Sequence, residues 1–196
     1  MEILLGILGV MMLLTLLVVG GAGGYGVKLY NRIVRRENQI DDAYGSIQSN
    51  LKRRHDLIPN LVSTVREYAD HESETLEKVV ELRNQAQSGD LSEQERQQVE
   101  AQLSGALDGL MMQVENYPDL KASDNFEHLQ RSLNEVEEQL SASRRFYNSA
   151  VTEYNDSIQT FPGNVIARAF NFEEREVFET EEHEPETPDV GALFDE

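Results

Sequence analysis

Residues 3–22 read ILLGILGVMMLLTLLVVGGA, a run of twenty residues without one charged side chain. An α-helix rises ~1.5 Å per residue, so this run spans ~30 Å, the thickness of the hydrocarbon core of a bilayer. The sequence that follows is polar, acidic and patterned as helices. The run therefore predicts a membrane anchor that tethers a domain lying outside the bilayer.

A cleaved secretory signal is the other kind of segment that carries an apolar run. Such signals begin with basic residues, contain about 7–15 apolar residues and end at small residues of the A-x-A type. Here the only early charge is Glu2 and the run is longer, which favours the anchor. Gly20 and Gly24 form a G-x-x-x-G pair, which lets two membrane helices approach closely. A flexible exit from the bilayer explains the same glycines, and we favour it.

The charges that flank the anchor predict its orientation. Four cations follow it, namely Lys28, Arg32, Arg35 and Arg36, while the N-terminal side has only Glu2. The positive-inside rule then places the N-terminus outside and the domain in the cytoplasm, on a single-pass protein of the cell (inner or plasma) membrane. The absence of cysteine is compatible with a reducing compartment.

The chain of 196 residues carries a formal charge of −19, concentrated at its C-terminal end. Residues 173–196 contain eleven carboxylates and one cation, Arg175. Nucleic acid is excluded as a partner because phosphate contacts require a basic face. With Pro185 and Pro188 and few apolar residues, this stretch is predicted to be a disordered acidic tail. A peptide captured by a partner through Val190, Leu193 and Phe194 is the alternative.

Between positions 27 and 86, apolar residues recur every seven positions in two series, which we call seams. The two seams are offset from each other by three or four residues, so they lie on one face of a helix. The first seam is Ile33, Ile40, Ile47, Arg54, Leu61, Tyr68, Thr75 and Leu82. The second is Tyr30, Glu37, Tyr44, Leu51, Ile58, Val65, Glu72, Val79 and Ala86. Pro59 does not shift the register, so we predict one long helix, of coiled-coil character, kinked near Pro59.

Two further helices have recognisable ends. Ser88-Gly89-Asp90 ends the first long helix, and the capping box Ser92-x-x-Glu95 begins a second that runs to about Asn116. The break at 117–119 precedes a third helix, capped by Asp124 with Glu127 or by Ser123, which Phe161-Pro162-Gly163 stops. A short apolar helical turn at 165–172 is expected to pack back on the bundle. The fold class is thus all-α, a transmembrane helix followed by an antiparallel bundle of long helices.

Several motifs of this sequence resemble the LemA family. They are Tyr30-Asn31, the run LKRRHDLIPNLV at 51–62, YADHE at 68–72, YPDLKA at 117–122, RRFYN at 144–148, Ala150-Val151, Tyr154-Asn155 and Phe161-Pro162. The resemblance covers essentially residues 1–172. It implies a single-pass membrane protein with an antiparallel helical bundle and no established enzymatic activity. The predicted division is an anchor at 1–24, a LemA-like bundle at 25–172 and the acidic tail at 173–196.

We find no motif of catalysis, cofactor binding or metal binding, so we expect neither catalytic nor ligand residues and no cofactor. The Glu-x-x-His pattern of di-iron bundles, H-E-x-x-H, the Walker loop, G-x-G-x-x-G and G-x-S-x-G are all missing from the sequence. The four histidines are His55, His71, His128 and His183. They are expected at the surface or in caps, since adjacent pairs such as His55-Asp56 diverge around a helix.

Polar residues on the apolar faces have two interpretations. Arg54, together with Asn148 and Asn155 seven residues apart, either forms a buried hydrogen-bonded layer that fixes helix register or a strip that receives a partner or ligand. We favour the layer. Tyr147 and Tyr154 are expected to pack in the core or in a groove. The cluster Lys52, Arg53 and Arg54 is expected to form ion pairs within the helix, with phosphate binding as the alternative.

Three functions of different classes follow from these observations. The first is a membrane-tethered scaffold or adaptor without catalysis, which forms a homo-oligomer, recruits an unidentified protein partner, or does both. The second is a membrane-shaping protein whose cations Lys28, Arg32, Arg35 and Arg36 contact anionic lipid. The third is an enzyme or metal protein with an unfamiliar site. The scaffold is favoured because long amphipathic helices and a tether are present and catalytic motifs are missing.

Overall fold

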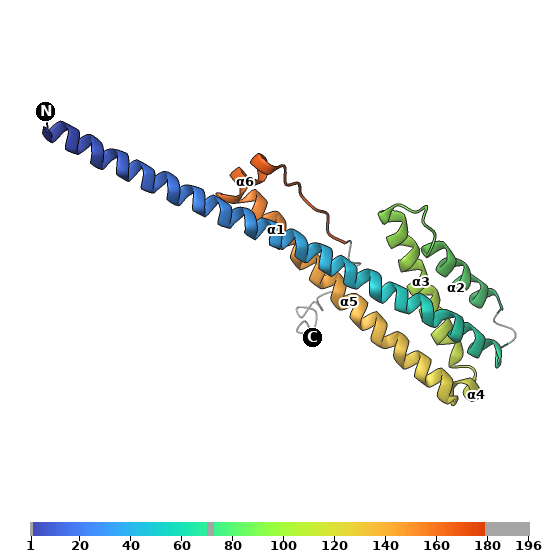
Figure 1. Cartoon of the computed structure of the whole chain (residues 1–196). Coiled ribbons are helices and arrows are strands. Elements are labelled where there is room, and N and C mark those ends of the chain that lie inside the picture. The colour runs from blue at the N-terminus through green and yellow to red at the C-terminus, as the bar shows by residue number, and fades with distance from the viewer. Residues whose placement is uncertain (1, 70–72, 179–196) are drawn as a thin grey trace, which may run out of the picture. The chain divides into compact units, whose positions relative to one another are not determined.

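The computed structural model describes residues 2–69 and 73–178 (Figure 1). Its helices are α1 (Glu2–Arg66), α2 (Ser73–Ala86), α3 (Glu93–Val114), α4 (Pro118–Lys121), α5 (Asp124–Gln159) and α6 (Gly163–Phe170). No strand occurs among these residues, which confirms the all-α class. The chain forms two compact units, one made of residues 1–40 with 146–196 and the other of residues 41–145. Helices α1 and α5 each contribute to the cores of both units, and the division of the chain at 24 and 172 stays a prediction.

Helix α1 continues through Pro59, as the unbroken register predicts. A proline inside a helix leaves the carbonyl four residues earlier without its usual N–H partner. Here that carbonyl belongs to His55, and Arg83 of α2 donates its Nε–H to it at 2.7 Å. The bond supplies the missing donor from another helix, so Pro59 interrupts the backbone ladder of α1 without leaving a buried acceptor unsatisfied.

This arrangement predicts a coupling between Pro59 and Arg83. Replacing Arg83 by methionine is expected to lower the free energy of unfolding by about 1–3 kcal/mol, because a carbonyl loses a charged donor. In a Pro59→Ala background the alanine N–H satisfies the same carbonyl, and the loss is expected to be at least halved. Urea denaturation of the four proteins, followed by circular dichroism, measures the coupling; equal losses in both backgrounds would contradict this account of Pro59.

The first long helix ends earlier than predicted. The seams predict helix to residue 86, but α1 stops at Arg66 and α2 begins at Ser73. The prediction was wrong because α2 returns to the same core, so Leu76, Val79 and Leu82 keep the heptad register across the turn. The polar run REYADHESE at 66–74 is the sequence signal of the break.

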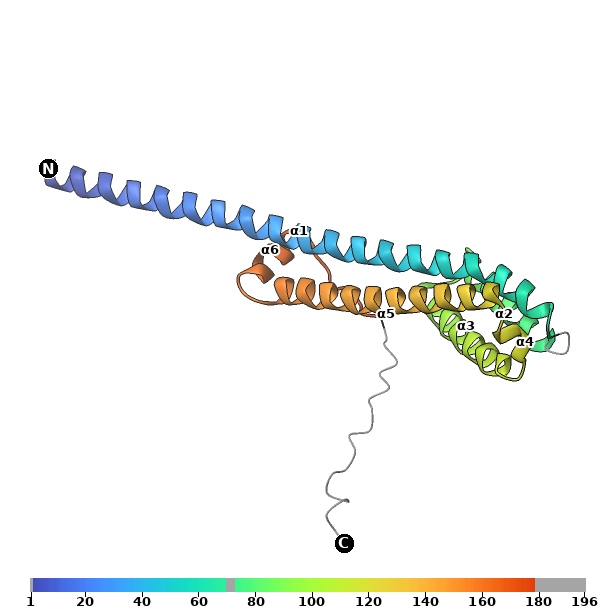
Figure 2. The ribbon, with the colours of Figure 1, turned by 90° about the horizontal axis from the view of Figure 1, so that it is seen from below.

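The 41–145 unit has a single apolar core made by α2, α3, α4, the C-terminal part of α1 and the N-terminal part of α5. Contacts of Asn50 with Ser143 and of Arg54 with Glu137 show that α1 and α5 run antiparallel here, as Figure 2 also shows. The predicted capping box is confirmed, since Ser92 and Glu95 exchange side-chain and backbone hydrogen bonds at the start of α3. Figure 2 shows α4 at the turn between α3 and α5.

The other unit packs the N-terminal part of α1 against the C-terminal part of α5 and α6. Its core contains Ile33, Ile40, Val151 and Tyr154. Helix α6 forms where an apolar turn was predicted, and it ends at Asn171, whose φ of 57° is left-handed and reverses the chain. The chain then continues as an extended segment, residues 172–178, which we call the C-terminal segment (Figure 1). Its hydrogen bonds to Asn155 and Asn148 place it along α5.

The C-terminal segment includes residues that the sequence assigns to the acidic tail. Residues 173–178 have a defined extended path that is fixed by hydrogen bonds to α5. Composition predicts that residues 173–178 are disordered because they are acidic and poor in apolar residues. Composition carries no information about hydrogen bonds made by the backbone. Residues 179–196, including Pro185, Pro188, Val190, Leu193 and Phe194, lie outside the described residues, so the rest of the predicted tail stays a prediction.

The apolar part of α1 makes few contacts with the rest of the chain. Within the described residues, α1 is the one helix long and apolar enough to cross a membrane. Its large apolar side chains between positions 7 and 19 are exposed. A Cβ added at Gly20 or Gly24 would meet no atom within 4 Å, so this small-residue face is open. These features agree with the predicted anchor.

Candidate functional site: an ionic core cluster and an asparagine site

Arg54 is the most deeply buried charge among the described residues, with 0% of its surface exposed. Its guanidinium forms a buried ion pair with Glu100 of α3, which is 2% exposed. It also donates to Glu137 of α5 at 2.7 Å and to the Ser104 hydroxyl at 2.8 Å. The side chain thus links three helices of the 41–145 unit at one level of their core.

His55 completes this cluster from the neighbouring position on α1. Its Nε2 lies 3.0 Å from the second carboxylate oxygen of Glu100, and its side chain is buried. The expectation that His55 lies at the surface or in a cap is therefore wrong. His128 is exposed as expected, while His71 and His183 lie outside the described residues.

The charges of the cluster determine its protonation. Burial, the largest single influence, raises the pKa of Glu100, but the His55 imidazole beside it and the charge of Arg54 together bring this pKa below its usual value. Burial and the charge of Arg54 lower the pKa of Arg144, which lies beside the cluster on α5. Glu100 is thus an ionised partner in a network and not a proton donor at neutral pH.

The cluster matches the first interpretation of Arg54, a buried hydrogen-bonded layer that fixes the relative position of helices. The expected ion pairs within α1 form only in part. Lys52 pairs with Asp56 at 2.8 Å, whereas Arg53 donates to Gln139 of α5 and Arg54 turns inward. In the part of the chain that the structure describes, no three His, Asp or Glu residues are grouped to hold a metal ion.

The second site lies on α5 in the other unit, where Asn148 and Asn155 bind the backbone of the C-terminal segment. The Asn155 amide donates to the carbonyl of Arg175 at 2.9 Å and accepts from its N–H at 3.0 Å. Asn148 makes the same pair of bonds with Phe178, at 3.1 and 2.8 Å. We call these two side chains the asparagine site.

Two tyrosines beside the asparagines extend the contact. Tyr154 donates its hydroxyl to the carbonyl of Glu173 at 2.9 Å, and Tyr147 donates to that of Glu176 at 3.3 Å. Tyr154 is fully buried, and burial raises the pKa of its hydroxyl. Their expected packing in a core or groove is correct. The preferred interpretation of the two asparagines as an interhelical layer is wrong, because both bind an extended segment instead.

Comparison with known proteins agrees with the family resemblance of the sequence motifs. The sequence profile of the LemA family matches residues 43–191. The chain belongs to the LemA family. It is 28% identical to Protein LemA of Metamycoplasma hominis, over 83% of this chain and 74% of that protein.

Magnetosome proteins are a second group of relatives of this LemA chain. It is 36% identical to magnetosome protein MamQ 1 of Paramagnetospirillum magneticum, but over 38% of this chain and 27% of that protein. It is 24% identical to magnetosome protein MamQ of Magnetospirillum gryphiswaldense, over 76% of this chain and 64% of that protein. The chain therefore spans less than two thirds of these magnetosome relatives. None of these names is that of an enzyme, and with the apolar helix they indicate a helical, membrane-associated protein.

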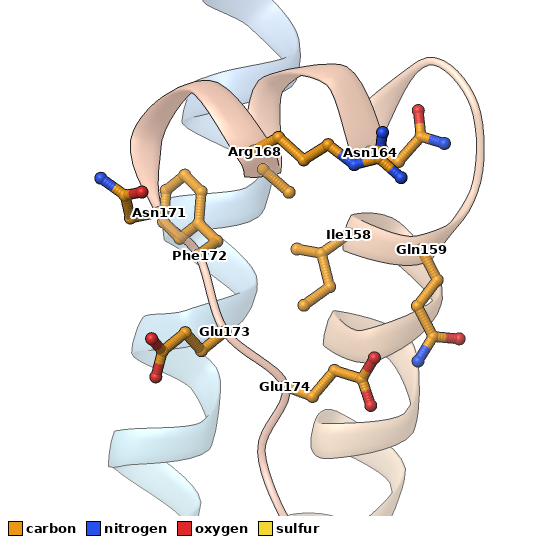
Figure 3. A pocket seen from close by; sticks show the side chains of 9 residues that line it. Ile158, Gln159, Asn164, Arg168, Asn171, Phe172, Glu173 and Glu174 are labelled. Carbon is orange, nitrogen blue, oxygen red and sulfur yellow. The ribbon is translucent and has the colours of Figure 1, made fainter.

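An open hollow of about 730 Å³ lies where the end of α5, α6 and the C-terminal segment meet (Figure 3). Ile158 and Phe172 form its apolar side, while Arg168 faces it from α6 and Glu174 from the segment. The hollow is part of the same unit as the asparagine site. No single sequence motif predicts the hollow, since its walls come from three segments that meet only after folding.

Proposed function

We propose that this LemA family protein is a membrane-tethered helical scaffold or adaptor that self-associates, recruits protein partners or does both, and that it carries out no catalysis. The observation that carries the proposal is the continuity of α1, which runs from the apolar segment to Arg66 without a linker. One helix therefore supplies both the anchor and packing surface for each of the two cores. The buried charges agree with a structural role for the bundle, since Arg54 forms an ion pair with Glu100 inside it.

The test of this proposal is in-cell cross-linking of the full-length protein, followed by purification and mass spectrometry. A scaffold is expected to give cross-links between two copies of this chain and to a small set of other proteins. The matched control is a chain whose residues 3–22 are replaced by a membrane helix of unrelated apolar sequence. Its cross-links from the helical units should persist. A full-length protein that gives no cross-link above that of an unrelated single-pass protein would contradict the proposal.

A membrane-surface function is the second candidate, and α6 favours it. The side chain of Ile166 would lie 3.8 Å from a Cβ added at Gly26 of α1. Gly26 lies four residues beyond the apolar run, or about 6 Å along a helix, which is within the ~5–8 Å headgroup layer. Helix α6 would therefore lie at headgroup level, where its exposed Val165 and Phe170 and the preceding Phe161 fit an interfacial contact.

If α6 contacts lipid, brominated lipid should quench the fluorescence of a tryptophan placed beside this helix. The chain contains no tryptophan, so Phe161→Trp introduces a single probe at a side chain that is 81% exposed. In liposomes with brominated lipid we expect at least half of its fluorescence to be quenched. Phe146→Trp is the control, because this exposed residue lies about two turns farther from the anchor than Glu153, which contacts Arg36. Equal quenching at both positions would contradict the interfacial placement of α6.

The basic residues after the anchor predict a dependence on anionic lipid. Lys28, Arg32 and Arg35 are exposed, whereas Arg36 is half-buried and bonded to Glu153. Each exposed cation near an anionic surface contributes about 1 kcal/mol. In the Phe161→Trp protein, reversing the three charges to Glu is expected to remove any extra quenching of the probe in anionic over neutral liposomes, while Arg36 stays intact. An unchanged difference between the two lipids would exclude electrostatic contact at these positions.

A further inference from the structure

The asparagine site binds the backbone of an extended segment through hydrogen bonds. Side chains of α5 bind six backbone atoms of the C-terminal segment, through Asn148, Asn155, Tyr147 and Tyr154. Each asparagine offers one donor and one acceptor to a single residue, as a neighbouring β-strand would. Main-chain bonds of this kind give affinity that depends little on the sequence of the bound segment.

The spacing of the two asparagines suits an extended segment. Seven helical residues rise about 10.5 Å, and three residues of extended chain cover about 10 Å. Asn155 and Asn148 accordingly hold Arg175 and Phe178, which are three residues apart, with the segment antiparallel to α5. Each asparagine binds both the N–H and the C=O of one residue. Inside a helical ligand these backbone groups are already paired with each other, so a helix would not offer both to each amide.

Two side chains of the segment supply specificity. The guanidinium of Arg175 donates to Glu37 of α1 at 3.0 Å. Phe178 is 7% exposed, and its ring lies 4.7 Å from that of Tyr147 in an edge-to-face arrangement. The side chains of Glu174 and Val177 are exposed. The segment thus contacts its surroundings through two side chains in the pattern Arg-x-x-Phe, in addition to its backbone.

We propose that this site accepts the C-terminal segment of a second copy, so that exchange of residues 172–178 links two chains. The segment of another copy has the same arginine, phenylalanine and backbone, so it fits the site without any new contact. The connection that would have to redirect is short, because the segment leaves α6 at the left-handed residue Asn171. The proposal deepens the self-association proposed above and rests on it.

Two complementary variants of the full-length protein test the exchange. The first, Asn148→Ala with Asn155→Ala, keeps the segment but loses the site. The second, Arg175→Ala with Phe178→Ala, keeps the site but loses the side chains that fill it. The two variants carry different affinity tags, are co-expressed in one membrane and are extracted in detergent. We expect them to co-purify at least tenfold more than two differently tagged copies of the same variant. Asn134→Ala, an exposed asparagine on the same helix, is the matched substitution control.

The outcomes separate this proposal from the one it rests on. Co-purification no higher than for a chain that carries all four substitutions overturns segment exchange. If the wild-type protein nevertheless has the mass of an oligomer, self-association proceeds through another surface; if it is a monomer, both proposals fail. Should the first variant not fold, as judged by circular dichroism, a fluorescent peptide of residues 171–178 is titrated onto the second variant. Saturable binding that Asn155→Ala weakens at least tenfold supports the site, and no binding overturns it.

Discussion

Replacing Glu100 by glutamine is expected to lower the free energy of unfolding of the 41–145 unit by about 3–5 kcal/mol. The carboxylate lies between Arg54 and His55 in the core, and its loss leaves the guanidinium charge buried with only Glu137 as a charged partner. Removal of one member of a buried ion pair costs far more than loss of a surface pair, because the remaining charge has no water around it. Urea denaturation in detergent, followed by circular dichroism, measures the effect.

The same substitution has a predicted pH dependence. The pKa of Glu100 in the folded chain lies below its usual value, which is about 4.3 in an unfolded chain. Ionisation of this group therefore adds stability that is fully present above the unfolded pKa and is lost as the pH falls through the folded pKa. Glutamine does not titrate, so the difference in stability between wild type and variant is expected to narrow below pH ~4.

Glu138→Gln is the control for charge and composition, since this glutamate is exposed on α5. Its effect on the free energy of unfolding is expected to stay within about 0.5 kcal/mol. A loss of similar size in both variants, or a Glu100→Gln difference that stays constant down to pH 3, would contradict the assignment of Arg54 and Glu100 as a buried ion pair.

Removing both side chains of the asparagine site is expected to release the C-terminal segment. The double variant Asn148→Ala and Asn155→Ala loses four hydrogen bonds to backbone, together worth about 2–4 kcal/mol. Amide exchange at Arg175 and Phe178 reports the release directly, because the N–H groups of these residues donate to the two asparagines. Their protection is expected to fall about 30- to 1,000-fold.

Amides of the 41–145 core are expected to keep their protection in that variant, because none of the lost bonds belongs to this unit. The single variant Asn134→Ala provides the matched control and should leave exchange at Arg175 and Phe178 unchanged. Protection of these two amides that survives the double substitution would mean that other contacts hold the segment, and the asparagine site would lose its assigned role.

Local signals in the sequence predicted much of the fold. The capping box of Ser92 and Glu95, the break at Pro118 and the stop near Pro162 lie close to the observed helix ends, because turn and cap chemistry acts over a few residues. The seams likewise predicted buried residues such as Ile33, Ile47 and Leu61. The sequence pattern did not predict that α1 ends at Arg66, because the connection to α2 leaves the heptad register unchanged.

The partners of polar residues were beyond the reach of the sequence pattern. The seam position of Arg54 indicated burial, but nothing local pointed to Glu100, which comes from another helix and was not singled out. The spacing of Asn148 and Asn155 placed them on one face of α5, yet the segment that they bind looked like part of an acidic tail. Both pairings join residues distant in sequence, so they are decided by tertiary structure and not by local propensity.

The mass of the full-length protein in nanodiscs is the measurement that tests the account most directly. Self-association through segment exchange or another surface predicts particles that contain two or more copies, with a distribution that does not change when protein is reconstituted at lower density. Mass photometry or native mass spectrometry resolves these species. One copy in every particle, at all protein-to-lipid ratios, would contradict the central claim that this LemA family protein assembles on the membrane as a scaffold.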